Sequence, residues 1–351
     1  MLPDADKITL GNWINCWLTD YIKPNVRIKS YEKYESCVNG YIRPKLGHIS
    51  IAKIKAPDVQ KTLNDLLVNG GRNGAGISSS TVRTTRRYLS MALRKAVQVG
   101  ILSKNVVEAT IPPRLIKEEI RPFTEEQANK LIAIAKAGEY LYLGVKQRRS
   151  PSLDHEYHKA MAYIVVVIAL STGMRLGEVF GLKWCDIDFT ANTLCVQRAL
   201  VSSNTKGMIF EEPKTKGSKR KIPVTVQVMK EVLKYQKEQC EYANFIGDKF
   251  VNQYNLLFTN LWGKPVDTSN FTTRYFKKML AQAQLNRGFS FHDLRHTHAT
   301  LLLRRGVNIK IISERLGHST IAMTLDTYSH LMPDMQETAV TALEGIFRIS
   351  Q

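Results

Sequence analysis

Cysteine is scarce and unpatterned in this sequence. The five cysteines are scattered along 351 residues, are odd in number and form no CxxC pair. This distribution argues against a disulfide framework and against a cysteine-ligated zinc site. The first residues also lack the basic segment followed by an apolar segment that marks a secretory signal peptide. We therefore expect a cytoplasmic protein.

Long apolar runs are lacking as well. The longest one covers residues 160–170, which is too short to span a bilayer and is typical of a buried core helix. No membrane-spanning segment is expected. With 351 residues, 44% of them hydrophobic, the chain is long and apolar enough to form two domains with separate cores.

Acidic residues are too few to balance the basic ones. Lys and Arg number 50 against 31 Asp and Glu, which gives a formal net charge of +19. The surplus is shared about equally between residues 1–112 and the rest of the chain. Plain solubility or binding to a membrane surface could account for it, but two basic domains suit a protein that grips a polyanion from two sides. The charge favours nucleic acid as the partner.

Residues 1–112 show apolar residues at helical spacing and are predicted to form a helical DNA-binding domain. Four helices are expected, with the glycine-rich residues 70–76 forming a loop before the fourth. The fourth helix carries a basic face that no acidic residue four positions on neutralises. Such a face is either a solvated surface or a contact with DNA phosphates or a groove. The candidate DNA-binding residues are Arg83, Arg86, Arg87, Arg94 and Lys95.

A proline-containing stretch, residues 113–123, is predicted to link this domain to a second one over residues 124–351. Thr124 and Gln127 form a capping box and predict a helix start directly after the linker. Residues 144–158 are expected to form an exposed loop. This loop contains His155 and His158, which could conceivably bind a metal ion, but a solvated loop is favoured.

The segment TGMRLGE, residues 172–178, places an arginine where two helices meet. A buried helix is expected to end at Gly173, and Arg175 is expected to begin the next one. Glu178 lies three residues further on and can hydrogen-bond the guanidinium, which would fix its orientation toward a cleft. A structural ion pair is the alternative interpretation.

A small antiparallel sheet is expected between residues 193 and 224, with strands at 193–201, 208–211 and 220–224. The turn before the last strand, PKTKGSK, holds Lys214, Lys216 and Lys219. A lysine at a hairpin tip can reach into a cleft and withdraw, as a mobile proton donor must. Lysines at such tips are also common because they aid solubility.

Two further segments carry histidines, an arginine and a tyrosine. In HDLRHTHAT, residues 292–300, His292 and Arg295 share one face where a helix begins; in LGHSTIAMTLDTYSH, His318 precedes Tyr328 by ten residues. His292 and His296 could in principle bind zinc, but HDLRH lacks the glutamate of the HExxH motif, so no metal site is expected.

Together these segments supply the groups that metal-free phosphoryl transfer on a DNA diester requires. Two guanidiniums can bind the non-bridging oxygens, a lysine can protonate the leaving oxygen, and a tyrosine can form the covalent adduct. A tyrosine with a pKa near 10 is neutral at pH 7, so a base or a strongly positive site must help to remove its proton. A neutral histidine is the natural candidate.

The three motifs TGMRLGE, HDLRHTHAT and LGHST…TLDTYSH occur in this order and resemble those of the tyrosine recombinases, in the branch of phage and conjugative-element integrases. The resemblance covers residues 8–347. It implies a mainly α fold with a helical core-binding bundle and a mainly helical catalytic domain that holds a small antiparallel sheet. It also implies strand cleavage and rejoining through a 3′-phosphotyrosine, without ATP, metal or another cofactor.

The same resemblance implies residue roles. Arg175, Arg295 and His318 would grip the scissile phosphate, and Tyr328 would be the nucleophile. His292 would act as base or acid. Lys214 would be the general acid, although Lys216 competes for that role and, with Lys219, could contact DNA instead.

The resemblance further implies double-stranded DNA as partner, a tetramer assembled on two paired sites and a possible accessory directionality factor. The apolar residues after position 338 recur at helical spacing, and this tail is expected to dock on a neighbouring protomer; packing on its own catalytic domain is the alternative. Many relatives begin with an arm-binding domain, whereas this sequence opens directly into core-binding helices. The rival functions are a type IB topoisomerase and a DNA-binding regulator that has lost catalysis.

Overall fold

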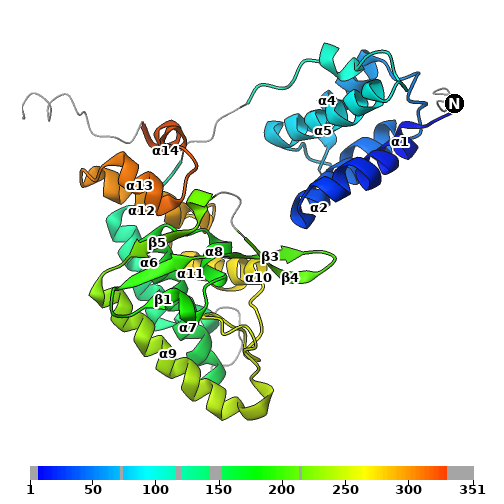
Figure 1. The fold of residues 1–351 in the computed structure, drawn as a ribbon. Helices are drawn as coiled ribbons and strands as arrows, with labels where there is room; N and C mark the ends of the chain where they lie inside the picture. Colours follow the sequence, from blue (N-terminus) through cyan, green and yellow to red (C-terminus); the bar gives the residue numbers. More distant parts are fainter. Residues whose placement is uncertain (1–6, 72–73, 116–119, 143–151, 213–215, 330–351) are drawn as a thin grey trace, which may run out of the picture. The chain divides into compact units, whose positions relative to one another are not determined.

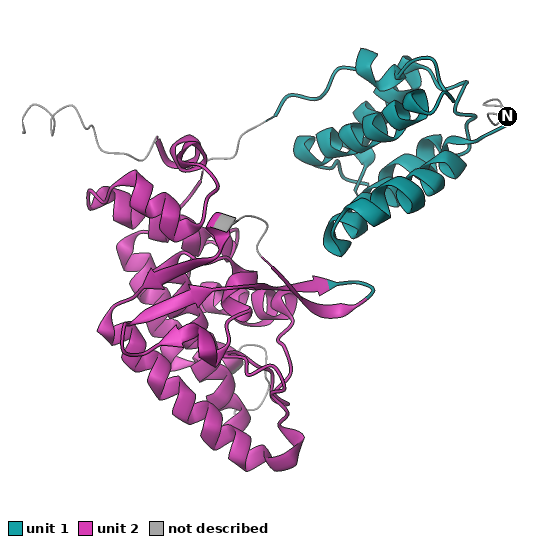
Figure 2. Ribbon diagram, viewed as in Figure 1, with its two compact units in different colours: residues 1–118, 203–205 teal, residues 119–202, 206–351 magenta. Residues whose placement is uncertain are grey.

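The computed structural model describes residues 7–71, 74–115, 120–142, 152–212 and 216–329. The chain divides into two compact units (Figure 2). Unit 1 consists of Met1–Glu118 and Ser203–Thr205, and unit 2 of Glu119–Ser202 and Lys206–Gln351. Most described elements are helices, and short antiparallel strands accompany them (Figure 1), which confirms the predicted mainly α fold.

Unit 1 is a helical bundle whose apolar stripes meet in one core. Leu10 and Ile14 are completely buried, and the indole of Trp13 donates a hydrogen bond of 2.9 Å to the carbonyl of Ala92 on the last long helix. The four helices expected from the periodicity are present. The elements are α1 (Leu10–Cys16) continued by η1 (Trp17–Ile22), η2 (Lys23–Asn25), α2 (Ile28–Cys37) continued by η3 (Val38–Ile42), α3 (Arg43–Leu46), α4 (Ala56–Asn69), α5 (Ser79–Gln98) and η4 (Val106–Ala109).

Unit 2 is built around one buried helix, α7 (Leu153–Thr172), which contacts α6 (Glu125–Ala137), α9 (Val226–Ile246) and α12 (His292–Arg304). Its apolar run is buried on nearly all sides, as the sequence predicted. The predicted capping box forms at the start of α6, where the side chains of Thr124 and Gln127 each accept from the other's backbone N–H. The other helices are η5 (Glu139–Tyr142), α8 (Leu176–Phe180), η6 (Trp184–Asp186), η7 (Lys216–Ser218), η8 (Gly247–Lys249), α10 (Thr268–Phe271), η9 (Thr272–Phe276), α11 (Lys277–Gln282), α13 (Ile309–Leu316) and α14 (Ile321–Tyr328).

The strands differ in detail from the expected three-stranded sheet. One sheet has the antiparallel order β1 (Ile187–Asp188), β2 (Thr193–Val196) and β5 (Arg220–Pro223). A separate hairpin pairs β3 (Ala199–Ser203) with β4 (Gly207–Glu211). The segment expected as a single strand at 193–201 is broken at Arg198, whose guanidinium turns back to bind the carboxylate of Asp186 and the carbonyl of Gly181.

A second difference concerns the loop expected at residues 144–158. Residues 143–151 lie outside the described part of the chain, but residues 153–158 form the first turns of α7, which Ser152 caps through its side chain. His158 is therefore a helix residue, and burial lowers its pKa to about 4. In the described residues no group of three or more His, Cys, Asp or Glu side chains is arranged to hold a metal ion.

Gly173 makes the turn between α7 and α8 that the sequence predicted. Its φ of 67° is left-handed, a conformation that side chains with a Cβ rarely adopt. The space around it is also filled, because a Cβ would lie 2.7 Å from Cδ2 of Leu316 and 2.8 Å from Cδ2 of His298. The turn therefore brings α7, α12 and α13 into close contact at the point where Arg175 begins α8.

Replacement of Gly173 tests this packing. Gly306 has a similar φ of 74°, but no atom of the described residues lies within 4 Å of its Cβ position, so Gly306→Ala should destabilise the protein by about 1–2 kcal/mol through backbone strain alone. Gly173→Ala should exceed that loss by about 1–3 kcal/mol because its Cβ also collides with two side chains. Urea unfolding of both variants is the measurement. Equal losses would show that the turn is not tightly packed.

Candidate active site

Arg175 lies at the amino end of α8, where its orientation is set by the residue three positions later. Its Nη1 donates to Oε1 of Glu178 at 2.8 Å, and its backbone N–H donates to Oε2 at 2.9 Å. The predicted contact between the two side chains is therefore present. The Arg175 side chain remains 41% exposed, so the ion pair orients the guanidinium without burying it.

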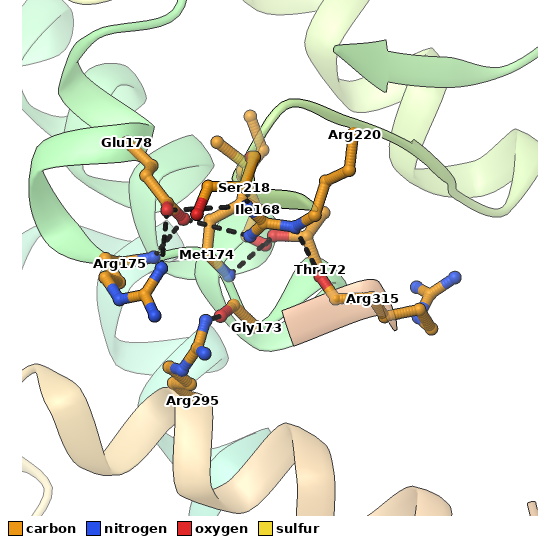
Figure 3. A network of polar contacts seen from close by, with 10 residues as sticks. All are labelled: Ile168, Thr172, Gly173, Met174, Arg175, Glu178, Ser218, Arg220, Arg295 and Arg315. Carbon is orange, nitrogen blue, oxygen red and sulfur yellow. Dashed lines mark hydrogen bonds and ion pairs between the residues drawn. The ribbon is translucent and has the colours of Figure 1, made fainter. Parts of the chain in front are cut away.

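Glu178 also holds a second arginine, Arg220 of β5, which the sequence analysis did not single out. Nη2 of Arg220 lies 2.9 Å from Oε2 of Glu178, and its Nε donates to the backbone carbonyl of Arg315 at 2.6 Å (Figure 3). Both side chains of this pair are nearly inaccessible, at 7% and 6%. Burial by itself raises the pKa of the Glu178 carboxyl, but the two arginines outweigh it and lower that pKa below its usual value.

Arg295 reaches the same region from α12. Its Nη1 donates to the carbonyl of Gly173 at 2.8 Å, and only 2% of the residue is exposed. Its Nη2 is also buried and has no hydrogen-bond partner among the described residues. Burial and the nearby charge of Arg175 lower the pKa of Arg295 to about 9. A buried cationic donor without an acceptor is costly, and an anion bound beside Arg175 would satisfy it.

His318 and His292 belong to the same cluster. His318 follows the left-handed Gly317 that ends α13, and its Nδ1 lies 2.7 Å from the hydroxyl of Thr324. Burial, followed by the charges of Arg295 and Arg175, lowers its pKa to about 4. His292 is the first residue of α12. The residue retains solvent exposure, but partial burial, followed by the neighbouring His296, Arg295 and Arg175, also lowers its pKa to about 4.

Tyr328, the last residue of α14, completes the cluster. The residue is only 1% exposed, and burial raises its pKa to about 12, while the charge of Arg295 acts in the opposite direction. Its hydroxyl oxygen lies 2.8 Å from Nδ1 of His296, a residue that the sequence analysis considered only as half of a zinc pair. The structure thus brings five of the six predicted catalytic residues into one region: Arg175, His292, Arg295, His318 and Tyr328.

The predicted lysines can be placed only in part. Lys214 and the side chain of Lys216 lie outside the described residues. Lys219 is half exposed, and its ammonium group lies 3.5 Å from the carboxylate of Glu212.

The basic residues of α5 divide into two groups. Arg83 and Arg86 are used within unit 1, because their guanidiniums donate to the carbonyls of Pro113, Val107 and Thr110. The others remain at the surface: Arg87 and Arg94 are exposed, and the ammonium of Lys95 lies 4.5 Å from the ring centroid of Tyr21. None of these residues has an acidic residue four positions on, but Arg94 has an acidic partner from the following segment, because its Nη2 lies 3.4 Å from Oε1 of Glu108.

One buried histidine of α12 connects the helices around Gly173. The Nδ1 of His298 lies 2.8 Å from the carbonyl of Leu170, and Nε of Arg315 lies 3.4 Å from its Nε2. A neutral ring with its proton on Nδ1 satisfies both contacts. Burial, together with the charge of Arg315, lowers the pKa of His298 to about 4.

Comparison with known proteins adds an independent observation. Residues 121–335 match the Phage integrase family, and residues 9–67 match the N-terminal SAM-like domain of phage integrases. A XerC-like tyrosine recombinase of Caldanaerobacter subterraneus subsp. tengcongensis is 30% identical over 98% of this chain and 85% of that protein. The transposase of transposon Tn916 from Enterococcus faecalis is 27% identical over 88% of this chain and 73% of that protein.

Solved structures show the same fold. The integrase of transposon Tn1549 in complex with a circular intermediate DNA superimposes with a TM-score of 0.74 at 24% identity, covering 96% of this chain and 99% of that one. A lambda integrase tetramer bound to a Holliday junction superimposes with a TM-score of 0.58 at 19% identity, covering 93% and 78%. Across the part of this chain that the structure describes, no helix is long and apolar enough to cross a membrane.

The pKa of His298 leads to a pH dependence of stability. The folded ring titrates near 4, whereas an unfolded histidine titrates near 6.5, so the unfolded state binds the extra proton between these values. The free energy of unfolding should fall as the pH is lowered from 6.5 to 4, by on the order of 3 kcal/mol from this residue.

Urea unfolding across this pH range is the measurement. His298→Asn keeps an amide donor near the position of Nδ1 but cannot titrate, so its curve should be flatter than that of the wild type, whereas His48→Asn at an exposed position should leave the slope unchanged. Parallel curves for the wild type and His298→Asn would contradict the assignment.

Proposed function

The chain belongs to the phage integrase family and is a tyrosine-type site-specific DNA recombinase, and we propose that Tyr328 is the nucleophile that attaches it to DNA. The observation that carries this assignment is that the hydroxyl of Tyr328 lies within the electrostatic reach of Arg295. Arg295 is close enough to act on the pKa of Tyr328, and the same arginine has a buried donor for which the described residues supply no acceptor. A phosphate that satisfies Arg295 would therefore lie beside the tyrosine.

Arg175, Arg295 and His318 are proposed to bind the scissile phosphate. Attack on phosphorus increases the negative charge on the non-bridging oxygens, and guanidiniums fixed in advance stabilise that charge without reorganisation. Arg175 is fixed by Glu178, and Arg295 by the carbonyl of Gly173. Since both anchors exist before DNA binds, the phosphate would enter a site that is already formed.

The leaving 5′-oxygen requires a proton, and Lys214, which lies in the sequence between β4 and β5, is the proposed donor, with Lys216 as the alternative. His292, the first residue of α12, is proposed to act as acid or base. The 3′-phosphotyrosine conserves the energy of the broken phosphodiester, and a free 5′-hydroxyl can reverse the reaction. Transesterification of this kind integrates or excises a mobile element without consuming ATP.

Residues 1–112 are proposed to act as the core-type DNA-binding domain, joined through residues 113–123 to the catalytic domain at 124–351. Within α5, Arg87, Arg94 and Lys95 have side chains at the surface that could contact phosphates. Arg83 and Arg86 would support DNA binding indirectly, because they hold the segment after α5. Lys216 and Lys219 are proposed as further DNA contacts.

Recombination joins two DNA sites, and a tetramer with two protomers on each site is the proposed assembly. The lambda integrase, a structural neighbour, has been solved as a tetramer on a Holliday junction. Apolar side chains on α13 and α14 support protomer contacts close to the nucleophile, because Ile311, Ile321, Met323 and Leu325 are 39–50% exposed. The tail of a neighbouring protomer is proposed to cover them, and an accessory factor could set the direction of recombination.

The nucleophile assignment is tested with Tyr328→Phe. The ring packs as before, so affinity for a half-site should change by less than about twofold, but the covalent adduct should be lost because the attacking oxygen is gone. A nicked suicide substrate and denaturing electrophoresis detect the adduct. Tyr275→Phe is the matched control and should retain it. An adduct that survives in Tyr328→Phe and disappears in Tyr275→Phe would move the nucleophile to Tyr275.

The tail assignment is tested by deleting residues 338–351. Binding of one protomer to a half-site should persist, whereas cooperative filling of a full site should weaken by about tenfold or more, since several apolar side chains lose their burial. Met323→Ser should have the same effect if α14 receives the tail. Phe245→Ser, at an exposed position on α9, is the control. Unaltered cooperativity after the deletion in a gel-shift titration would show that the tail packs on its own protomer.

A further inference from the structure

The hydroxyl of Tyr328 has a specific partner within its own unit. Nδ1 of His296 lies 2.8 Å from the hydroxyl oxygen, and the two rings meet at 63° with centroids 5.6 Å apart. This contact joins α12 to α14. Since the oxygen that receives the hydrogen bond is the proposed attacking atom, the role of His296 extends beyond packing.

The other histidines near the site are engaged elsewhere. The Nδ1 of His318 lies against the hydroxyl of Thr324, and that of His298 lies against the carbonyl of Leu170. His292 meets the ring of His296 edge-on, at 86° with centroids 4.8 Å apart. Within the described part of the chain, His296 is thus the histidine whose ring nitrogen is in hydrogen-bonding contact with Tyr328.

At pH 7 the pair starts in the protonation states that transfer from the phenol to the imidazole requires. Burial raises the pKa of Tyr328 to about 12, so the phenol is neutral at pH 7 and carries a proton to donate. Burial lowers the pKa of His296; Asp293 opposes this effect and Arg295 adds to it. A neutral imidazole with an unprotonated Nδ1 can accept the hydrogen bond of the phenol.

We propose that His296 is the general base that accepts the phenolic proton of Tyr328 during strand cleavage. The proposal rests on the nucleophile assignment given above. As the bond between the tyrosine oxygen and phosphorus forms, the bond between phosphorus and the 5′-oxygen breaks. The phenolic proton passes to Nδ1 of His296, and the leaving 5′-oxygen takes its proton from the general acid, proposed as Lys214. Rejoining reverses each transfer, so His296 returns its proton to the tyrosine oxygen.

The position of His296 on α12 strengthens the assignment. It directly follows Arg295, whose Nη1 is bound to Gly173 and whose Nη2 is the proposed phosphate donor. One rigid helix therefore carries both the group that binds the phosphate and the group that accepts the proton, and α14 brings the nucleophile to them. His292 would then be free to act on the substrate rather than on the tyrosine.

The test measures single-turnover formation of the covalent adduct by the full chain on a suicide half-site, with DNA affinity measured in parallel. His296→Ala should slow adduct formation by about 100-fold or more while half-site affinity stays within about twofold. His296→Asn places an amide near Nδ1 that can hydrogen-bond the phenol but cannot carry away its proton. It should remain as slow as the alanine variant.

Chemical rescue separates a base from a structural contact. Added imidazole should restore part of the rate of His296→Ala, and a series of substituted imidazoles should restore more as their basicity rises. His298→Ala, which removes a neighbouring ring from the same helix, should not be rescued. Rescue of His292→Ala instead would assign the base to His292.

Three other results would overturn the proposal. They are a wild-type rate of adduct formation for His296→Asn, no rescue of His296→Ala by imidazole, and faster adduct formation by His296→Ala than by the wild type. The last result would mean that the contact with His296 restrains the tyrosine. The nucleophile assignment fails separately in the same assay. An adduct that persists in Tyr328→Phe would remove both proposals, whereas an unaffected His296→Ala alongside an inactive Tyr328→Phe would remove only this one.

Discussion

The buried carboxylate of Glu178 makes the contacts on which the candidate catalytic cluster depends. It binds Arg175, three residues away, and Arg220, which comes from a strand 42 residues further along the chain. Arg220 in turn holds the end of α13 through the carbonyl of Arg315. Removing one partner from a buried ion pair typically costs about 3–5 kcal/mol, because the other charge is left uncompensated. One carboxylate thus fixes Arg175, the proposed phosphate ligand, and the helix that precedes His318.

The remaining cluster residues are arranged around this anchor by close packing. Gly173 allows α7, α12 and α13 to meet, and its carbonyl fixes Arg295. His318 follows Gly317 at the end of α13. The next helix, α14, then brings Tyr328 back to α12, where the tyrosine hydroxyl lies 2.8 Å from Nδ1 of His296. The result is a positively charged site with one buried donor that no described residue satisfies. A phosphate diester supplies the charge and the acceptor that this arrangement lacks.

Local sequence patterns predicted the helices and the contacts between residues that are close together in the sequence. The contact between Arg175 and Glu178 follows from a spacing of three residues at a helix start, and the helices follow from apolar periodicity. The roles of Arg220 and His296 could not be predicted in this way, because their partners lie 42 and 32 residues away. The break at Arg198 was missed for a related reason: alternation favoured a continuous strand, whereas β2 pairs in one sheet and β3 in a separate hairpin, a tertiary arrangement that alternation does not encode.

The central claim is that Arg295 and Arg175 form a site for the scissile phosphate before DNA binds. A structure of the Tyr328→Phe variant with an intact half-site tests it directly. The account predicts a non-bridging oxygen of the scissile phosphate within hydrogen-bonding distance of Nη2 of Arg295 and of the guanidinium of Arg175, with the contacts to Glu178 and Gly173 retained. A scissile phosphate bound elsewhere, with Nη2 of Arg295 still lacking an acceptor, would contradict it.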